Sequence, residues 1–404
     1  MKYIIVLGDG MADEPIADLG GKTPLQVAKT PSMDYLAKNG KTGTLVTVPE
    51  GFHPGSEIAN LSVLGYDVAK VFEGRGSLEA ASMGIDIEAN EMAMRCNLIC
   101  IEDEKIKNHS AGHISNEEAT ELISFLQKNL GNDVVSFYPG ISYRHLLKIK
   151  NADKRVSCTP PHDVPGVAYK DVLVKPQVED ATYTSDLINN LILKSQELLS
   201  SHPINIKRVS EGKDPANSIW PWSPGYKPSM QTMSELYGIK KGVVISAVDL
   251  IRGIGVYAGL QPIIVDGATG LYDTNYEGKV DAAIKALRDD VDFVFLHIEA
   301  SDEAGHEGDV ALKIKTIEYL DSRVLRPLIE ALDTIDDDVT IAVLPDHPTP
   351  CRIRTHTSQP VPFVIYNKGI KADAVEHFDE KSALNGLFGE IAGDELIKKM
   401  IVKH

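Results

Sequence analysis

Short apolar segments rich in β-branched residues recur along this chain, and segments with helical spacing separate them. The clearest apolar runs are residues 3–7, 291–298, 339–344 and 361–366. Runs that are apolar at every position are typical of strands buried on both faces of a parallel sheet. Amphipathic stretches such as 311–332 are typical of the helices that cover such a sheet. The sequence therefore predicts an α/β fold with a mostly parallel sheet and helices on both faces.

The middle of the chain follows a different pattern. Polar turns are more frequent there, the strand-like segments alternate in polarity, and one helix is predicted at 116–129. A chain of 404 residues is long enough for two domains. We therefore expect a discontinuous core formed by 1–65 and 177–404, and a smaller inserted α+β domain formed by 66–176. The segment 213–228 is rich in Pro, Trp and Gly, so it is expected to be a loop.

The composition excludes several classes of function. The formal net charge is −17, which disfavours binding to nucleic acid or to an anionic membrane, because both require basic surface. No apolar stretch approaches the roughly 20 residues of a membrane-spanning helix, and the N-terminal run is too short for a secretion signal. The four cysteines contain no Cys-x-x-Cys pair, so free buried thiols and a cytoplasmic location are expected.

Carboxylate and histidine side chains follow three of the predicted strands. These candidate metal ligands are Asp9, Asp302, His306, Asp346, His347 and, a little further on, His356. Asp302 and His306 are four residues apart, so a helical turn would place both on one face. Because the carboxyl ends of parallel strands meet at one edge of a sheet, we expect these ligands to lie close together. Oxygen and nitrogen ligands of this kind suit Mn²⁺, Zn²⁺ or Mg²⁺.

Ser56 precedes an apolar segment that is predicted to be a helix. A serine in this place is often a helix cap, whose hydroxyl accepts a backbone N–H. The same place also suits a nucleophile, because the free N–H groups and the dipole of a helix N-terminus stabilise a phosphoserine. Coordination to a metal would lower the pKa of the hydroxyl and replace a neighbouring base. Together with the metal ligands, Ser56 therefore predicts phosphoryl-transfer chemistry.

Ordered motifs along almost the whole chain resemble those of a known family. They are Leu7-Gly8-Asp9-Gly10-Met11, Gly20-Gly21-Lys22-Thr23-Pro24-Leu25, Pro54-Gly55-Ser56-Glu57, Leu64-Gly65-Tyr66-Asp67, Gly74-Arg75-Gly76-Ser77-Leu78-Glu79-Ala80, Tyr143-Arg144-His145, 299–306 and Pro345-Asp346-His347. With them the chain resembles the alkaline phosphatase superfamily and, within it, the archaeal-type 2,3-bisphosphoglycerate-independent phosphoglycerate mutases. The resemblance implies an alkaline-phosphatase-like core and a glycolytic isomerase that interconverts 3-phosphoglycerate and 2-phosphoglycerate.

The resemblance also implies how the ligands are shared between two divalent metal ions. One ion would be held by Asp302, His306 and His356, and the other by Asp9, Ser56, Asp346 and His347. Ser56 would be phosphorylated transiently. Mn²⁺ is the favoured ion, and the small phosphorylated substrate would react without added 2,3-bisphosphoglycerate.

The substrate site that the resemblance implies lies in the inserted domain, which would close over the core and exclude water. Arg144 is the first candidate for binding a phosphate or carboxylate group, followed by Arg75, Arg95 and Arg252. His113 stands where the archaeal-type pattern has Arg. The longer mutases have a His in a comparable Gly-x-His segment, which implies that His113 binds substrate or transfers a proton.

Other functions could use the same ligands. Glu57-Ile58-Ala59-Asn60 and the Ala-Gly-His segment at His113 are also typical of a bacterial subgroup proposed to be homoserine kinases of threonine biosynthesis. A metal-dependent phosphohydrolase would result if the insert did not exclude water. A non-catalytic binding protein is disfavoured because all seven ligands are present. We find no nucleotide-binding motif, since the first glycine of Gly253-Ile254-Gly255 does not follow a predicted strand, and Gly21-Lys22-Thr23 lacks the upstream glycine of a P-loop.

Overall fold

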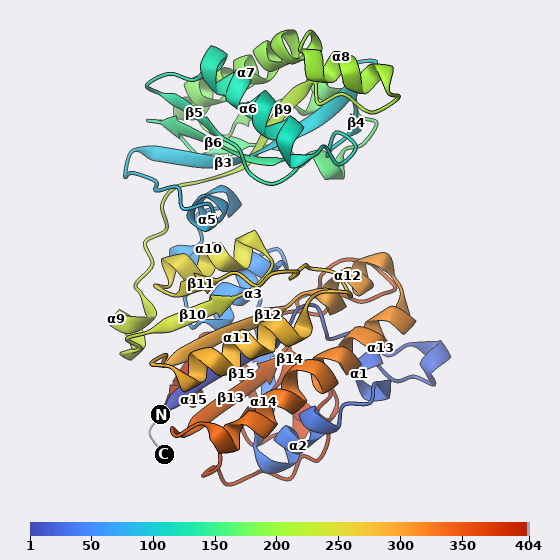
Figure 1. Cartoon of the computed structure of the whole chain (residues 1–404), viewed down its shortest axis with the longest axis vertical. Helices are drawn as coiled ribbons and strands as arrows, with labels where there is room; N and C mark the ends of the chain where they lie inside the picture. Colours follow the sequence, from blue (N-terminus) through green and yellow to red (C-terminus); the bar gives the residue numbers. More distant parts are fainter. Residues whose placement is uncertain (402–404) are drawn as a thin grey trace. The chain divides into compact units, whose positions relative to one another are not determined.

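The computed structural model describes residues 1–401 of the chain. The chain divides into two compact units (Figure 1). Unit 1 is formed by Met1–Phe72 and Ser229–His404, and unit 2 is formed by Glu73–Pro228. Within residues 1–401, none of the helices has both the length and the apolar character that crossing a bilayer requires.

The centre of unit 1 is a mostly parallel sheet, which has eight strands within the described residues. Its strands, in spatial order, are β11 (Gln261–Ile263), β10 (Gly242–Ile245), β12 (Phe293–Ile298), β1 (Lys2–Gly8), β13 (Val339–Leu344), β14 (Val361–Tyr366), β2 (Lys41–Val46) and β15 (Glu390–Ala392). The central strand β1 pairs in parallel with both β12 and β13, whereas β14 is antiparallel to its two neighbours. The carboxyl ends of β10, β12, β1 and β13 therefore meet at one edge.

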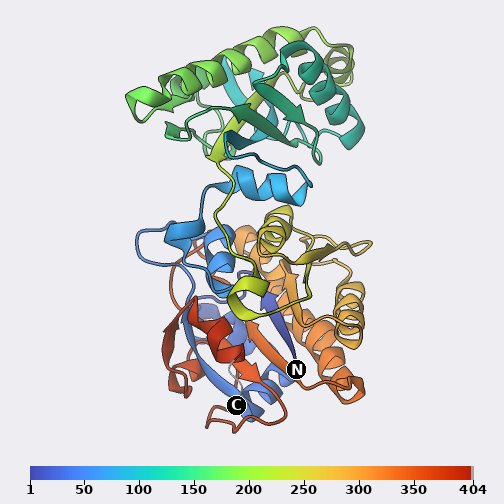
Figure 2. The same cartoon turned by 90° about the vertical axis from the view of Figure 1, so that its left-hand side faces the viewer.

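Helices cover both faces of this sheet (Figures 1 and 2). One face carries α2 (Pro31–Asn39), α11 (Tyr276–Arg288), α13 (Val310–Tyr319) and α14 (Arg326–Ala331), and the other carries α3 (Ser56–Val63) and α10 (Asp249–Tyr257). Alternate strand residues divide between the two faces. Ile4 and Val6 join the core under the first set of helices. On the second face a Cβ at Gly255 of α10 would lie 2.5 Å from Cγ1 of Val244. The predicted α/β architecture is thus confirmed.

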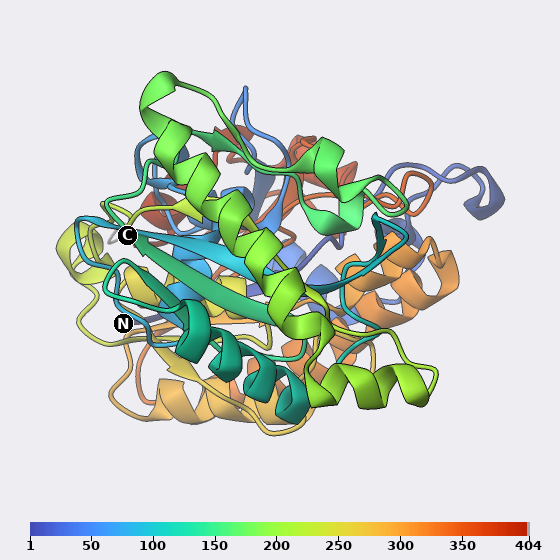
Figure 3. The same cartoon turned by 90° about the horizontal axis from the view of Figure 1, so that it is seen from above.

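Unit 2 is an α+β unit built on an antiparallel sheet. Its strands are β4 (Lys105–Asn108), β3 (Glu91–Glu102), β6 (Arg144–Lys150) and β5 (Val135–Tyr138), with β9 (Ser218–Gly225) also paired to β3. The helices α6 (Asn116–Leu130) and α7 (Thr182–Ser200) lie across one face of this sheet (Figure 3). Met94 and Leu98 of β3 belong to the core beneath them. Arg95 and Asn97 alternate with these residues and so face the other side of the sheet.

The predicted end of the insert near 176 is wrong. Unit 2 continues to Pro228 and begins at Glu73 rather than at 66. The reason is that α7 packs on β9, and β9 pairs with β3 in the sheet of unit 2. The predicted loop 213–228 therefore contains a strand. Its prolines obscured the strand pattern. Pro221 lies opposite Cys96 in the regular register, whereas Pro224 falls in a register shift between Ala93 and Arg95.

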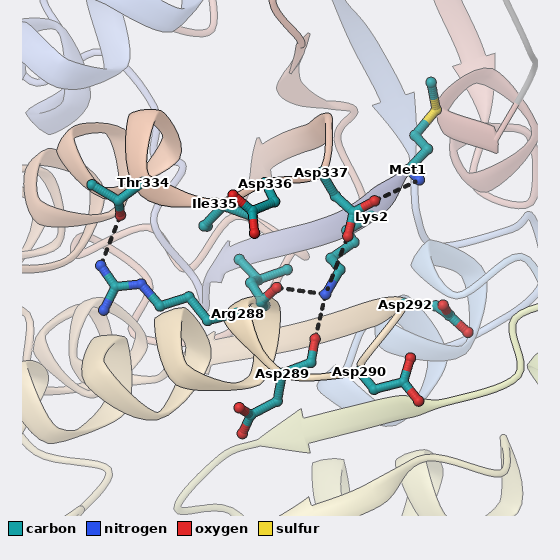
Figure 4. Close-up of a pocket in the computed structure, with 11 residues that line it drawn as sticks. Met1, Lys2, Arg288, Asp289, Asp290, Asp292, Thr334, Ile335, Asp336 and Asp337 are labelled. Carbon is teal, nitrogen blue, oxygen red and sulfur yellow. Dashed lines mark hydrogen bonds and ion pairs between the residues drawn. The ribbon is translucent and has the colours of Figure 1, made fainter.

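A pocket of about 670 Å³ lies at the opposite, amino ends of β1 and β13 (Figure 4). Its acidic lining residues are Asp289, Asp290, Asp292, Asp336 and Asp337. The ammonium group of Lys2 donates to the carbonyl oxygens of Leu287 (2.6 Å) and Asp289 and lies 3.6 Å from Asp337. This pocket is therefore part of the fold's ion-pair network, on the edge that does not carry the predicted ligands.

Candidate active site

The structure brings the predicted metal ligands together at the carboxyl edge of the sheet in unit 1. Asp9 follows β1, Asp302 and His306 lie on α12 (Ala300–Glu307) directly after β12, and Asp346 and His347 follow β13. Ligand atoms of Asp9, Asp346 and His347 lie within 4.8 Å of one another, and so do those of Asp302, His347 and His356. His347 belongs to both groups, so the two groups form one continuous centre.

His306 joins this centre through Asp302 and His356. Its Nε2 lies 3.1 Å from Oδ2 of Asp302 and 3.0 Å from Nε2 of His356. The hydrogen bond with Asp302 raises the pKa of His306 to about 9 against the opposing effect of burial. Two ring nitrogens and a carboxylate that converge in this way form a ligand set that a divalent cation fits.

Ser56 is the first residue of α3, and its hydroxyl does not cap the helix. Gly55 occupies the N-cap position, and no side chain makes a capping bond there. Instead, Oγ of Ser56 lies 3.2 Å from Nε2 of His347. The same nitrogen lies 3.6 Å from Oδ1 of Asp9 and 3.4 Å from Oδ2 of Asp346. The capping interpretation is therefore wrong, and the hydroxyl group belongs to the cluster of candidate ligands.

The electrostatics of the buried carboxylates also fit a metal centre. Burial, and then repulsion from Asp346 and Asp302, raise the pKa of Asp9 well above its ordinary value. Its Oδ1 atom is buried without a hydrogen-bond partner among residues 1–401. Burial would also raise the pKa of Asp302, but hydrogen bonds from His306 and His356 hold it well below the usual range. A divalent cation would both satisfy Oδ1 of Asp9 and offset the repulsion between the carboxylates.

Sequence reasoning missed the residues that orient these carboxylates. Asn60 donates through Nδ2 to Oδ2 of Asp346 (2.9 Å), and Thr349 donates through Oγ1 to Oδ1 of Asp302 (2.5 Å). His297 approaches Oδ2 of Asp9 at 2.8 Å. For His297, the signal in the sequence is a histidine inside the otherwise apolar run 293–298.

Gly10 allows the chain to pass close to the centre. Its φ is +58°, and a Cβ there would lie 2.4 Å from Oδ1 of Asp302. A side chain would therefore collide with a candidate ligand as well as strain the backbone. The Gly10 N–H instead donates to Oδ1 of Asp346 (3.1 Å).

Lys313 links the loop after β1 to the segment that carries Thr349 through hydrogen bonds and an ion pair. Its side chain is fully buried, and its ammonium group contacts Oδ2 of Asp13 (2.9 Å) and the carbonyl oxygens of Ala12 (3.0 Å) and Thr349 (2.8 Å). We expect Lys313→Met to lower the free energy of unfolding of unit 1 by about 3–5 kcal/mol, because it leaves the Asp13 charge buried and unpaired. Urea denaturation measures this loss. Lys315→Met, at an exposed position of α13, is the control, and an equally small loss for both variants would contradict the role of Lys313.

A second cluster, which we call the insert cluster, lies in unit 2. It consists of Arg75, Arg95, Asn97, His109, Tyr143, His162 and Trp222. The guanidinium carbon of Arg95 lies 5.0 Å from the ring centre of Trp222, and that of Arg75 lies 6.0 Å from it. The rings of His162 and Trp222 are 5.3 Å apart, and His109 lies 6.1 Å from His162 and 5.8 Å from Tyr143.

The insert cluster brings two guanidinium groups to one carboxylate. Arg95 is buried and donates to Oε1 of Glu79 (2.9 Å), and Nε of Arg75 donates to the same oxygen (3.2 Å). One carboxylate thus serves two guanidinium groups. Burial lowers the pKa of Arg95; attraction to Glu79 opposes this shift, and repulsion from Arg75 and Arg144 adds to it. In a chain with a net charge of −17, guanidinium groups gathered in one place favour binding of an anion.

The other predicted substrate residues are divided between the two units. Arg144 begins β6, opposite Asn97 in the register of β3, and so lies beside the insert cluster. His113 lies 6.2 Å from Tyr143 between ring centres. Arg252 lies instead in unit 1, on α10, where it pairs with Asp249. The structure therefore groups Arg75, Arg95, Arg144 and His113 in one unit and leaves Arg252 outside that group.

A sheet edge that carries carboxylates, imidazoles and a serine at a helix N-terminus is typical of metal-dependent phosphoryl-transfer enzymes. Residues 37–205 match the family model of 2,3-bisphosphoglycerate-independent phosphoglycerate mutase. A protein of Methanosarcina acetivorans with this name is 53% identical over 403 residues, which cover 99% of this chain and 100% of that protein. A probable mutase of Geobacter sulfurreducens is 48% identical, over 95% of each chain.

Two solved structures extend the likeness to the fold. A protein of Pyrococcus horikoshii matches with a TM-score of 0.84 and 30% identity, over 99% of this chain and 96% of that one. The cofactor-independent phosphoglycerate mutase of Thermoplasma acidophilum matches with a TM-score of 0.68 and 26% identity, over 99% of both chains. The chain belongs to the 2,3-bisphosphoglycerate-independent phosphoglycerate mutase family.

Proposed function

We propose that this chain is a phosphoglycerate mutase that interconverts 3-phosphoglycerate and 2-phosphoglycerate through a phosphoserine at Ser56. The observation that carries the proposal is the position of the Ser56 hydroxyl, 3.2 Å from His347 in a centre of buried carboxylates and imidazoles. Family membership supplies the substrate. The relatives described above whose names state an activity are phosphoglycerate mutases, which favours the mutase over the homoserine kinase alternative.

The ligand set supports two divalent ions, with Mn²⁺ favoured. Asp9, Ser56, Asp346 and His347 would hold one, and Asp302, His306 and His356 would hold the other. When bound, such ions stabilise the negative charge on the attacking and leaving oxygens of an in-line phosphoryl transfer. His347 lies between the two groups, which supports a closely spaced pair of ions.

The chain's own residues account for the covalent steps. Oγ of Ser56 loses its proton and forms a bond to phosphorus, while the bond between phosphorus and the substrate oxygen breaks and that oxygen takes up a proton. The neighbouring hydroxyl oxygen of the same glycerate then loses its proton and forms a bond to phosphorus, while the bond to Oγ breaks and Oγ takes up a proton. Because Ser56 opens α3, the free N–H groups and the dipole of that helix stabilise the phosphoserine. The two steps balance without a further reactant.

The insert cluster supports a role for unit 2 in substrate binding. Its guanidinium groups suit a carboxylate or phosphate, and burial lowers the pKa of His109 and that of His162, which favours the neutral form of each ring. Arg144 and His113 remain proposed substrate residues beside this cluster. The closing of unit 2 over the core, and substrate binding by Arg252, stay predictions.

We expect Arg95→Met to raise the KM for 3-phosphoglycerate about 10- to 100-fold, because a hydrogen bond to a charged group contributes about 1.5–3 kcal/mol. Mn²⁺ binding should not change, since Arg95 belongs to unit 2. Steady-state kinetics and calorimetry measure the two quantities. Arg155→Met is the control, because Arg155 lies in the same unit with a side chain that is 52% exposed and paired with Asp153. Equal KM values for the two variants would exclude the insert cluster as the anion site.

Parallel assays of the purified protein with Mn²⁺ test the proposed activity. One contains 3-phosphoglycerate, with 2-phosphoglycerate detected through enolase, and the other contains homoserine and ATP. We expect product in the first assay without added 2,3-bisphosphoglycerate. O-phosphohomoserine in the second assay, with no 2-phosphoglycerate in the first, would overturn the proposal.

A further inference from the structure

His297 is a buried polar residue with no part in the covalent steps above. It lies on β12, is 0% exposed and has the apolar neighbours Leu296 and Ile298. A buried imidazole is costly unless both ring nitrogens have hydrogen-bond partners. His297 has both, and the identity of the partners suggests a function.

A chain of hydrogen bonds crosses three neighbouring strand ends at this position. Ser246 follows β10, His297 is the last residue but one of β12, and Asp9 follows β1. These three strands are adjacent and parallel. Oγ of Ser246 lies 3.1 Å from Nδ1 of His297, and Nε2 of His297 lies 2.8 Å from Oδ2 of Asp9. All three side chains are buried. This chain of hydrogen bonds therefore ends on Asp9, a proposed metal ligand.

The positions of the hydrogen atoms in these hydrogen bonds follow from the donors that are available. The N–H of Val248 donates to Oγ of Ser246 (3.0 Å), so the serine hydroxyl is free to donate its own hydrogen to Nδ1 of His297. Nε2 then carries the ring hydrogen and donates it to Oδ2 of Asp9. This bond leaves Oδ1 as the carboxylate oxygen without a hydrogen-bond partner in the described part of the chain.

We propose that Ser246 and His297 are positioning residues for the metal ion bound by Asp9. Ser246 fixes the tautomer of His297, and His297 holds one oxygen of Asp9 so that the other is presented to the ion. Partners of this kind behind a ligating residue typically change metal affinity about 10- to 100-fold when removed. The inference rests on the proposed metal centre and assigns to it two residues that do not themselves bind the ion.

Calorimetric titration of Mn²⁺ into metal-free protein tests the proposal independently of catalysis. We expect His297→Leu to weaken one of the two ions about 10- to 100-fold and to leave the other nearly unchanged. His297→Gln should lose less affinity, because its amide N–H₂ can still donate to Asp9. Ser246→Ala should also lose less, since the imidazole remains.

His145→Gln is the matched control. His145 is likewise buried on a strand, with a side chain that accepts from the Gly140 N–H, but it lies in unit 2. We expect the His145→Gln variant to bind both Mn²⁺ ions with the affinities of the wild type. Equal loss of affinity in this variant would mean that general destabilisation is the cause and would overturn the proposal.

The tautomer of His297 distinguishes positioning from packing. If the residue only filled space in the core, removing the Ser246 hydroxyl would not change which ring nitrogen carries the hydrogen. In protein with ¹⁵N-labelled histidine, NMR should show the ring hydrogen of His297 on Nε2 in the wild type and a shift toward Nδ1 in Ser246→Ala. An unchanged tautomer together with unchanged Mn²⁺ affinity in Ser246→Ala would overturn the proposal, even if His297→Leu failed to fold. Failure of the wild type to bind Mn²⁺ would instead overturn the metal centre itself.

Discussion

Replacing Ser56 with Ala is expected to lower the rate of phosphoglycerate interconversion by at least about 1,000-fold, because removal of a nucleophile abolishes the covalent route. The fold should be unaffected. The hydroxyl is not a helix cap, so the variant loses no capping bond of α3. Ser62→Ala is the control, since Ser62 lies on the same helix but packs against Gly393. Steady-state kinetics on both variants measures the effect.

Trapping the phosphorylated enzyme identifies the residue that carries the phosphate. Rapid mixing of the wild type with 3-phosphoglycerate, followed by acid quench and peptide mass spectrometry, should find phosphate on the peptide that contains Ser56. The Ser56→Ala variant should give no phosphopeptide. Turnover of the Ser56→Ala variant close to that of the wild type, or phosphate on another residue, would refute the role of Ser56 as nucleophile.

Removal of divalent metal is expected to abolish activity and to lower the melting temperature of unit 1. The buried carboxylates of Asp9, Asp302 and Asp346 repel one another, and bound ions offset that repulsion. An ion at 100 times its dissociation constant stabilises the folded state by about 2.7 kcal/mol. For a unit of this size that corresponds to a shift of about 5–10 °C per ion.

The measurement is differential scanning calorimetry before and after treatment with a chelator, with the metal content verified by elemental analysis. Added Mn²⁺ should restore both the melting temperature and the activity. A chelator-treated protein that contains no metal, yet melts and reacts as before, would exclude the metal centre. The His145→Gln variant should respond to the chelator as the wild type does.

Most of the candidate ligands could be predicted from sequence because they follow buried apolar runs. Strands of a parallel sheet end at one edge, so Asp9, Asp302 and Asp346 had to meet there. The i, i+4 spacing of Asp302 and His306 likewise fixed their common face, and both contact one another on α12. These are local patterns whose consequences are set by secondary structure.

The rest depends on pairings that local patterns do not encode. The insert cluster forms because β9 pairs with β3, which sets Trp222 opposite Arg95. The prolines of β9 made that strand look like a loop, and the error moved the predicted end of the insert. The strand that carries His297 was predicted correctly, but the role of His297 was not. An apolar run predicts a strand whether or not one of its residues is polar. The partner of His297, Ser246, becomes visible only from the order of β10, β12 and β1.

In the proposed reaction, the phosphoryl group moves from 3-phosphoglycerate to Ser56 and back to the same glycerate without reaching water. The most direct test is ³¹P NMR of the Mn²⁺-loaded protein with 3-phosphoglycerate in ¹⁸O-labelled water. We predict that 2-phosphoglycerate accumulates with no ¹⁸O in its phosphate and that little inorganic phosphate forms. Inorganic phosphate carrying ¹⁸O as the main product, with no 2-phosphoglycerate, would contradict the mutase reaction and identify a phosphohydrolase.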